Sequence, residues 1–186
     1  MKKLILGGVL LSVASMASAQ LYLGGSLGQA RIDVDCSLVK SCDKSDVGAK
    51  LYGGYKLNPL VALEAGWIDF GKVKASEPGY SASQKSSAFT LAAAFRGQLT
   101  RQLSVVGRAG VAVVDSKFKE RSVYGPSYVE YYSDSESATK PYLGLGVEFA
   151  VYKGLKLTAS ADFSRWKIDD ESGSLRMISV GAQYDF

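Results

Sequence analysis

The chain has 186 residues, of which 22 are lysine or arginine, 18 are aspartate or glutamate and none is histidine. The formal net charge of +4 is spread without a long run of one sign, which excludes the basic footprint of a nucleic-acid-binding protein. Beyond the N-terminal segment no stretch is long and apolar enough for a membrane-spanning helix, although 47% of the residues are hydrophobic. This combination favours a soluble β protein or a membrane β-barrel.

The N-terminal segment has the three parts of a secretory signal peptide. A basic start, Met1 to Lys3, is followed by the apolar stretch Leu4 to Val13 and by the small residues Ala17, Ser18 and Ala19. The apolar stretch has about ten residues, whereas a spanning helix needs roughly twenty. We therefore expect residues 1–19 to be removed and residues 20–186 to form one domain.

Eight later segments alternate between apolar and polar residues with the period of two that is typical of half-buried strands. Each is long enough to cross a bilayer when tilted. The pattern predicts an all-β fold, an eight-stranded antiparallel up-and-down transmembrane β-barrel. Its expected strands are residues 20–32, 47–57, 60–70, 87–99, 103–117, 139–151, 155–167 and 174–186.

The connections between these segments alternate between long and short. The short ones carry turn residues: Asn58-Pro59, Thr100-Arg101-Gln102 and Lys153-Gly154. The four long ones are polar and cover residues 33–46, 71–86, 118–138 and 168–173. Short turns on the periplasmic side and longer extracellular loops are characteristic of bacterial outer-membrane barrels. We therefore expect both termini in the periplasm and four loops outside the cell.

The last predicted strand shows which face would look outward. Ile178, Val180 and Tyr184 share one face with the terminal Phe186, and polar residues such as Gln183 occupy the other. Aromatic residues near the ends of the apolar faces resemble the interfacial girdles of membrane barrels. The residues assigned to these girdles are Tyr55, Trp67, Phe95, Phe149, Phe163, Trp166 and Tyr184.

Cys36 and Cys42 lie close together in a polar stretch of a chain that we expect to be exported, and such paired thiols are normally oxidised. The interpretation is a disulfide, because two cysteines without histidine are too few for a metal site. The acidic clusters at residues 33–35 and 169–171 lack the glycine placement and ligand count of a calcium loop. We therefore expect no metal and no cofactor.

Six charged residues fall on inward positions of the predicted strands. An eight-stranded barrel is just wide enough for side chains to fill it, so we expect these charges to pair into one network that plugs the interior. Glu64 and Glu148 could also be viewed as a carboxylate pair for acid–base chemistry, but paired interior charge is the simpler interpretation. The six residues are Lys50, Glu64, Arg96, Arg108, Glu148 and Asp162.

Four stretches resemble, in the same order, the membrane domain of the OmpA-like outer-membrane proteins: LYGGYKLNPLVALEAGWIDFGK, GRAGVAVVDSK, LGLGVEFAV and ISVGAQYDF. The sequence stops at the barrel, so the resemblance does not imply the family's peptidoglycan-binding domain. It does imply that the terminal Phe186 acts as the aromatic signal read by the barrel-assembly machinery. Family members carry inward glutamates at the positions of Glu64 and Glu148 and an inward arginine at Arg108.

The sequence departs from this family at Ala94 and Thr158, where a well-known member has a lysine and an arginine that pair with the two glutamates. Arg96 or Arg108 must therefore supply the countercharge, and we expect a static plug rather than a gate that exchanges partners. Histidine-dependent outer-membrane enzymes have no counterpart here, since a Ser or Thr nucleophile would lack a base.

The sequence as a whole predicts a non-enzymatic protein of the bacterial outer membrane with a structural or surface-interaction role. The expected partners are outer-membrane lipid and lipopolysaccharide, the barrel-assembly machinery, and a surface ligand bound by the loops. The third long loop, with Tyr124, Tyr128, Tyr131 and Tyr132, has a composition used by adaptable binding surfaces. The alternative function is a narrow channel for small solutes or ions.

Overall fold

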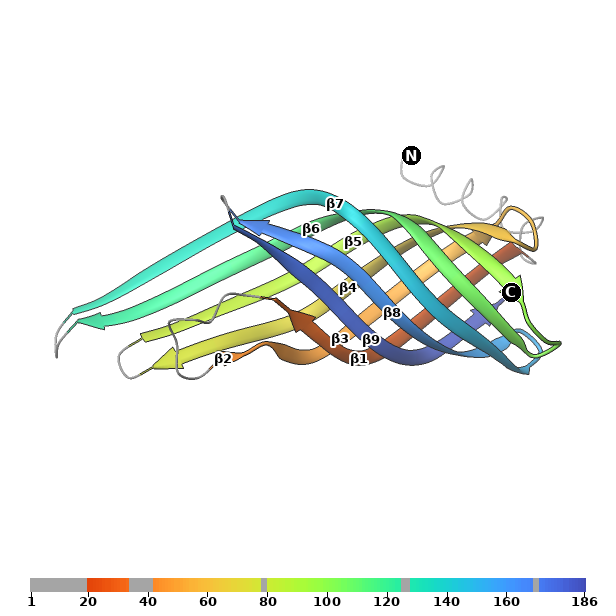
Figure 1. The fold of residues 1–186 in the computed structure, drawn as a ribbon, viewed down its shortest axis with the longest axis horizontal. Helices are drawn as coiled ribbons and strands as arrows, with labels where there is room; N and C mark the ends of the chain where they lie inside the picture. The colour runs from red at the N-terminus through yellow and green to blue at the C-terminus, as the bar shows by residue number, and fades with distance from the viewer. Residues whose placement is uncertain (1–19, 34–41, 78–79, 125–127, 169–170) are drawn as a thin grey trace, which may run out of the picture.

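The computed structural model describes residues 20–33, 42–77, 80–124, 128–168 and 171–186 (Figure 1). Residues 1–19 and Cys36 lie outside these ranges, so the signal peptide and the Cys36–Cys42 disulfide remain predictions from the sequence. Among the described residues, no helix has the length and apolar character needed to cross a membrane.

Eight long strands and one two-residue strand form a single sheet in the described part of the chain. Every strand pair is antiparallel, and the pairings of β1 with β9 and of β4 with β5 close the eight long strands into a ring. The predicted eight-stranded antiparallel barrel is confirmed. The strands are β1 (Leu21–Ile32), β2 (Cys42–Asp43), β3 (Ser45–Lys56), β4 (Val61–Glu77), β5 (Tyr80–Gln98), β6 (Leu103–Tyr124), β7 (Tyr128–Tyr152), β8 (Leu155–Ile168) and β9 (Glu171–Asp185).

The short turns lie at the end of the barrel where β1 begins and β9 ends (Figure 1). Side chains that mimic backbone acceptors stabilise two of them. Asn58 Oδ1 accepts hydrogen bonds from the backbone N–H groups of Leu60 and Val61, both at 2.8 Å, and Thr100 Oγ1 accepts one from Leu103 at 3.0 Å. In the third turn Gly154 has a φ of +75°, which favours glycine because it has no Cβ.

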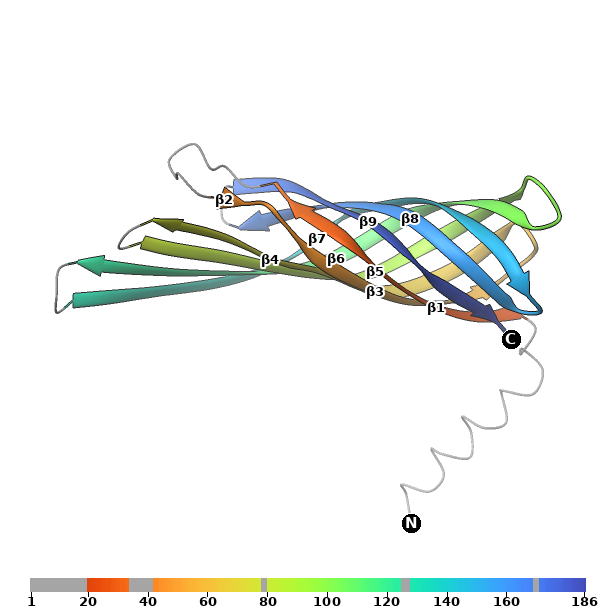
Figure 2. The same ribbon diagram turned by 90° about the horizontal axis from the view of Figure 1, so that it is seen from below.

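Strands β4 to β7 are much longer than the alternation predicted. Residues 71–77 and 80–86 continue the β4–β5 hairpin, and residues 118–124 and 128–138 continue the β6–β7 hairpin, where the sequence analysis expected loops. Figures 1 and 2 show these hairpins projecting beyond β8 and β9. In these extensions polar residues occur at both odd and even positions, so apolar and polar residues no longer alternate. The hydropathy pattern therefore predicted only the part of each strand that has one apolar face.

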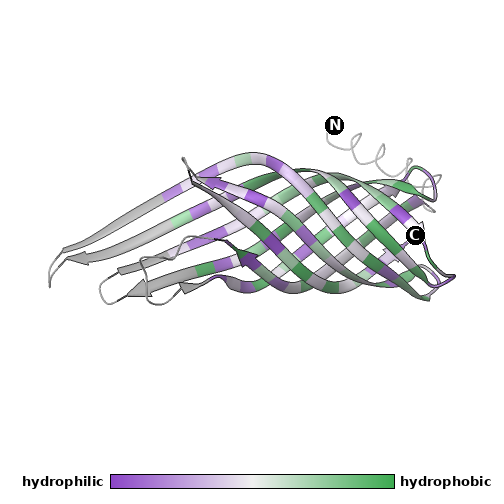
Figure 3. Cartoon of the chain, viewed as in Figure 1, coloured by the Kyte–Doolittle hydropathy of each residue, from purple (hydrophilic) through white to green (hydrophobic). Residues whose placement is uncertain are grey.

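The outward face of the barrel is an apolar wall. Leu27, Leu145, Ile178 and Val180 are between 63% and 71% exposed, and hydrophobic residues spread over the part of the barrel nearer the short turns in Figure 3. Of the seven predicted girdle residues, six are exposed outward, but the assignment of Trp166 is wrong. Its parity points inward, where it is 5% exposed and its indole Nε1 donates to the Asp33 carbonyl oxygen at 3.1 Å.

The inward face has two apolar clusters at different heights. The smaller cluster, nearer the short turns, contains Tyr22, Tyr52, Ala62, Ala94 and Val106. The larger cluster lies nearer the hairpin end of the barrel. The interior is therefore less polar at the hairpin end than expected from the sequence. The larger cluster consists of Ala30, Ile32, Ile68, Phe70, Val73, Ala88, Ala92, Ala112, Val114, Tyr142, Trp166, Leu175 and Met177.

Candidate functional site

The six charged residues singled out in the sequence all point into the barrel. Lys50, Glu64, Arg108, Glu148 and Asp162 are at most 4% exposed, and the side chain of Arg96 is 8% exposed. They come from six successive strands, β3 to β8, one residue from each. Side chains of a strand alternate between its two faces, so residues an even number of positions apart share a face. Each of the six charged residues is an even number of positions from another inward residue of its strand.

The six residues form three short ion pairs across the interior. Arg108 Nε lies 2.7 Å from Glu64 Oε1, and Lys50 Nζ lies 2.7 Å from Asp162 Oδ1. The third pair joins Arg96 Nε to Glu148 Oε1 at 3.1 Å. Arg108 and Arg96 therefore supply the countercharges of Glu64 and Glu148.

Three buried tyrosines connect these pairs, and they were not among the residues predicted from the sequence. The Tyr22 hydroxyl donates to Glu64 Oε2 at 3.0 Å, while its ring lies 4.4 Å from the Arg96 guanidinium carbon. Tyr142 donates to Asp162 and accepts from Lys50 Nζ at 2.9 Å. The Tyr52 ring lies between 5.2 and 5.3 Å from the cationic groups of Lys50 and Arg108. Cation–π contacts and hydrogen bonds thus join the three ion pairs into one column.

A sequence signal for two of these tyrosines exists in the register of β1 and β3. Tyr22 is paired with Gly54, and Tyr52 is paired with Gly24. A Cβ on either glycine would lie within 2.4 Å of the opposite tyrosine ring. Each ring therefore packs over a glycine, and a residue with a larger side chain at that position would clash with it. The repeated spacing Tyr-x-Gly in both strands could have indicated these inward aromatic residues.

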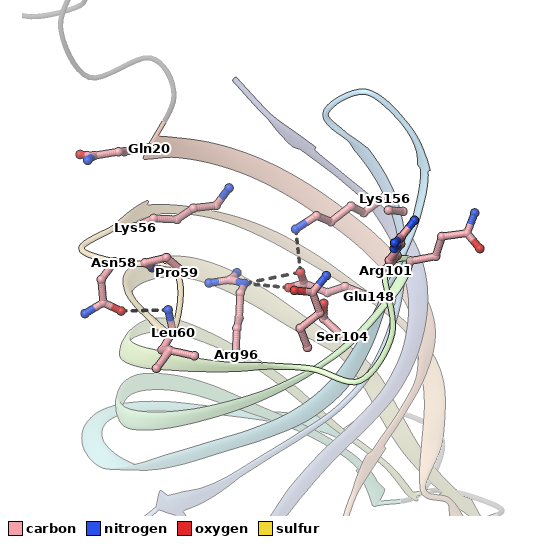
Figure 4. Close-up of a pocket in the computed structure, with 13 residues that line it drawn as sticks. Gln20, Lys56, Asn58, Pro59, Leu60, Arg96, Arg101, Ser104, Glu148 and Lys156 are labelled. Carbon is pink, nitrogen blue, oxygen red and sulfur yellow. Dashed lines mark hydrogen bonds and ion pairs between the residues drawn. The ribbon is translucent and has the colours of Figure 1, made fainter.

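Further charges continue the column toward the short turns. Lys156 Nζ lies 3.1 Å from Glu148 Oε2 and 3.0 Å from Asp185 Oδ2, and Lys56 Nζ lies 2.7 Å from the same oxygen of Asp185. Figure 4 shows Glu148 between Arg96 and Lys156 in a pocket of about 540 Å³ at this mouth of the barrel. The charge network is thus larger than the six residues expected from the sequence.

The chemistry available at this site is limited by the pairing. Each carboxylate that could act in acid–base catalysis has its own arginine, since Glu64 binds Arg108 and Glu148 binds Arg96. Among the described residues, no three His, Cys, Asp or Glu side chains are grouped closely enough to hold a metal ion. The ion pairs join non-adjacent strands across the interior.

Of the other two predicted sites, the structure describes Phe186 and Cys42. Phe186 is 58% exposed, its N–H donates to the Leu21 carbonyl at 3.0 Å, and its ring packs edge-to-face against Tyr184 at 5.2 Å between centroids. Cys42 is part of β2, next to β4, while its predicted partner Cys36 is outside the described residues.

The model of the family described as the OmpA-like transmembrane domain matches residues 16–186, nearly the whole chain. The chain belongs to this family. Among curated relatives of the OmpA-like family, outer membrane protein A of Salmonella typhi is 24% identical over 172 residues, and that of Shigella flexneri is 26% identical over 133 residues.

The matched regions cover 89% and 70% of this chain but only 48% and 37% of the two relatives. The chain therefore spans about half the length of the curated relatives it matches, or less. Membership of this family makes the chain a protein of the bacterial outer membrane.

Three solved structures of the same fold are distant from this chain in sequence. Ail, the attachment invasion locus protein of Yersinia pestis, has a TM-score of 0.56 at 20% identity, with 90% of this chain and 99% of that chain covered. Neisserial surface protein A has a TM-score of 0.56 at 15% identity, with 89% and 97% covered. OprG of Pseudomonas aeruginosa gives 0.55 at 12%, with 91% and 98% covered. These likenesses show the fold.

We predict that Glu64→Ala lowers the free energy of unfolding in urea by about 3–5 kcal/mol, because it leaves the buried guanidinium of Arg108 unpaired. Lys85→Ala is the matched control, since Lys85 forms a 2.9 Å ion pair with Asp69 but its side chain is 54% exposed. Breaking that pair should cost less than about 1 kcal/mol. Equal losses in the two variants would contradict the role assigned to the interior pair.

Proposed function

We propose that this chain is a non-enzymatic outer-membrane barrel with a plugged interior and four extracellular connections, acting in membrane structure and surface interaction. The observation that carries the proposal is the column of paired charges and aromatic rings inside the barrel. Side chains from six strands meet there at ion-pair distances of 2.7–3.1 Å. Lipopolysaccharide and outer-membrane lipid would surround the apolar wall.

Two layers of the interior support a plug. Conduction needs a continuous path of water or of exchangeable charge, but the six charges of the three central ion pairs are paired with one another and at most 8% exposed. Toward the hairpins the large apolar cluster adds Phe70, Trp166, Leu175 and Met177, each at most 5% exposed. A path through the barrel would have to cross both layers.

The proposed orientation follows from the asymmetry of the two ends. The three short turns and the C-terminus share one end, and the projecting hairpins form the other (Figure 1). Membrane barrels of bacteria have short periplasmic turns and longer extracellular loops. The β4–β5 and β6–β7 hairpins would then extend away from the cell surface.

The β6–β7 hairpin offers a surface for interaction. Residues Tyr128 to Ser133 pair with β6 on one side, and pairing of β7 with β8 begins only at Leu143, so within the described residues no strand pairs with the other edge of Tyr128 to Ser133. Unpaired backbone groups on such an edge can accept an extended partner segment. Ail of Yersinia pestis, which has the same fold, was solved in complex with the heparin analogue sucrose octasulfate, a ligand reported for that protein.

The absence of an enzymatic role is part of the proposal. Acyl transfer by a Ser or Thr nucleophile needs a base, and the chain has no histidine. Glu64 and Glu148 are buried and each forms an ion pair with an arginine, so neither carboxylate is free to contact a substrate as a general base.

The second candidate function, a narrow channel, is favoured by one observation. The pocket of about 540 Å³ at the short-turn mouth is lined by charged side chains, including Lys56, Arg101 and Lys156. It would serve as a vestibule if the ion pairs beyond it could separate.

Conductance distinguishes the two functions. We expect the wild-type protein to be nearly silent in planar bilayers, because the paired column blocks ion flow. Glu64→Ala and Glu148→Ala should admit small ions as well as lose stability to urea. Steady single-channel steps from the wild type, together with full stability of both variants, would replace the plug with the channel.

Protease accessibility tests the orientation. Protease added to intact cells should cut only within residues 34–46, 71–86, 118–138 or 168–173, because the proposed orientation places these connections outside the cell. Cells opened before digestion provide the control, since the short turns are then accessible. Cleavage near Asn58 or Lys153 in intact cells would overturn the orientation.

We also propose that Phe186 is read by the barrel-assembly machinery, as its exposed position beside β1 allows. Deleting Phe186 should lower the folded, heat-modifiable fraction in cell membranes, while refolding of the purified protein in detergent, which does not involve that machinery, should change little. Unchanged assembly in cells would remove this role.

A further inference from the structure

Three arginines are neighbours on the outer wall near the hairpin end of the barrel. Arg31 in β1 is directly opposite Arg176 in β9. Arg165 in β8 is opposite Ser174, two residues from Arg176 on the same strand face. All three are exposed and share the outward parity of their strands. We refer to Arg31, Arg165 and Arg176 as the arginine row.

The arginine row stands at the border of the apolar wall. In β9 the next outward residues toward the short turns are Ile178 and Val180, which are 71% and 67% exposed. In β1 the row is separated from Leu27, 63% exposed, only by Gln29. Outward residues two apart on a strand are separated by about 6.6 Å. The guanidinium groups therefore lie within one or two such steps of the hydrocarbon, at the level of lipid headgroups.

The charges of this row are not balanced within the described chain. Like charges directly opposite each other on a sheet repel and destabilise the strand pair. None of the three arginines forms an ion pair among the described residues, in contrast to the arginines of the interior. One outward carboxylate, Asp33, lies beyond the row and accepts a hydrogen bond from the Ser174 hydroxyl at 3.5 Å. A surplus of positive charge remains at the lipid boundary.

A second set of cations on the wall differs in its surroundings. Lys72 is opposite Lys85, and Lys85 is opposite Lys117. We refer to Lys72, Lys85 and Lys117 as the lysine row. Lys85 is already paired with Asp69, and the next outward residues toward the short turns are Asp69, Ser87 and Asp115. Acidic residues therefore separate this row from the apolar wall.

We propose that the arginine row binds the phosphate groups of lipid A, the anchor of lipopolysaccharide in the outer leaflet. Guanidinium groups bind phosphate with two parallel hydrogen bonds, which suits arginine at such a site. The acyl chains of the same molecule would lie against Leu27, Ile178 and Val180. The assignment to the outer leaflet rests on the orientation given under the proposed function, whereas the phosphate site itself does not.

Binding to lipid A of defined phosphorylation tests the proposal. Folded protein purified in neutral detergent is titrated with diphosphorylated lipid A and with lipid A lacking both phosphates. The triple variant R31Q/R165Q/R176Q should bind the diphosphorylated form at least tenfold more weakly, and the dephosphorylated form as the wild type does. The control K72Q/K85Q/K117Q removes the same number of charges from the lysine row and should change either affinity less than twofold.

Thermal stability gives a second readout that a merely structural role of the arginines would not produce. Without lipid A the arginine-row variant should be at least as stable as the wild type, because the cross-strand repulsion is gone. Added diphosphorylated lipid A should raise the melting temperature of the wild type and of the control, but not that of the variant.

Three outcomes would overturn the proposal. The first is unchanged binding of diphosphorylated lipid A by the arginine-row variant. The second is an equal loss in the lysine-row control, which would indicate general attraction to anions. The third is an equal loss of binding to phosphatidylglycerol vesicles, which would make the site one for any anionic headgroup. Since the detergent assay does not depend on topology, a failure of the orientation would appear only in the protease experiment.

Discussion

The need to pair every backbone N–H and C=O group inside a membrane governs the rest of this structure. No water is available there to satisfy an open edge, so the sheet closes through the β1–β9 pairing. In the closed sheet, successive side chains of a strand point alternately to the lipid and to the interior. The apolar wall, the paired charges inside and the arginines at the lipid boundary all follow from that alternation.

The membrane-spanning fold was predictable because one face of each strand is apolar, and period two is then visible in the sequence. The hairpin ends of β4 to β7 were not predictable in this way, since residues such as Ser116, Lys117 and Ser135 are polar on either face. Trp166 was misassigned because its nearness to a strand end was considered without its parity. The inward neighbours Asp162 and Ser164 would have placed it inside.

Within the site, parity was enough to identify the six interior charges but not their partners. Glu64 and Arg108 are on β4 and β6, which are not adjacent, so their contact depends on the tilt and stagger of strands around the whole barrel. Sequence spacing does not contain that information. The lysine and aspartate at the short-turn mouth, Lys156 and Asp185, were missed because only mid-strand charges were considered.

Closure also constrains how the protein forms. Tyr22 of β1 pairs with Asp185 of β9, so the contact that closes the barrel joins residues from opposite ends of the chain. The first strand therefore completes its pairing only after the last strand is in place. Contacts of such long range make folding slow, because their loop entropy is lost before they form. Until β9 arrives, β1 and the most recent strand remain open edges that invite pairing with other chains. The interval between export and closure is therefore the time when this protein is most exposed to aggregation.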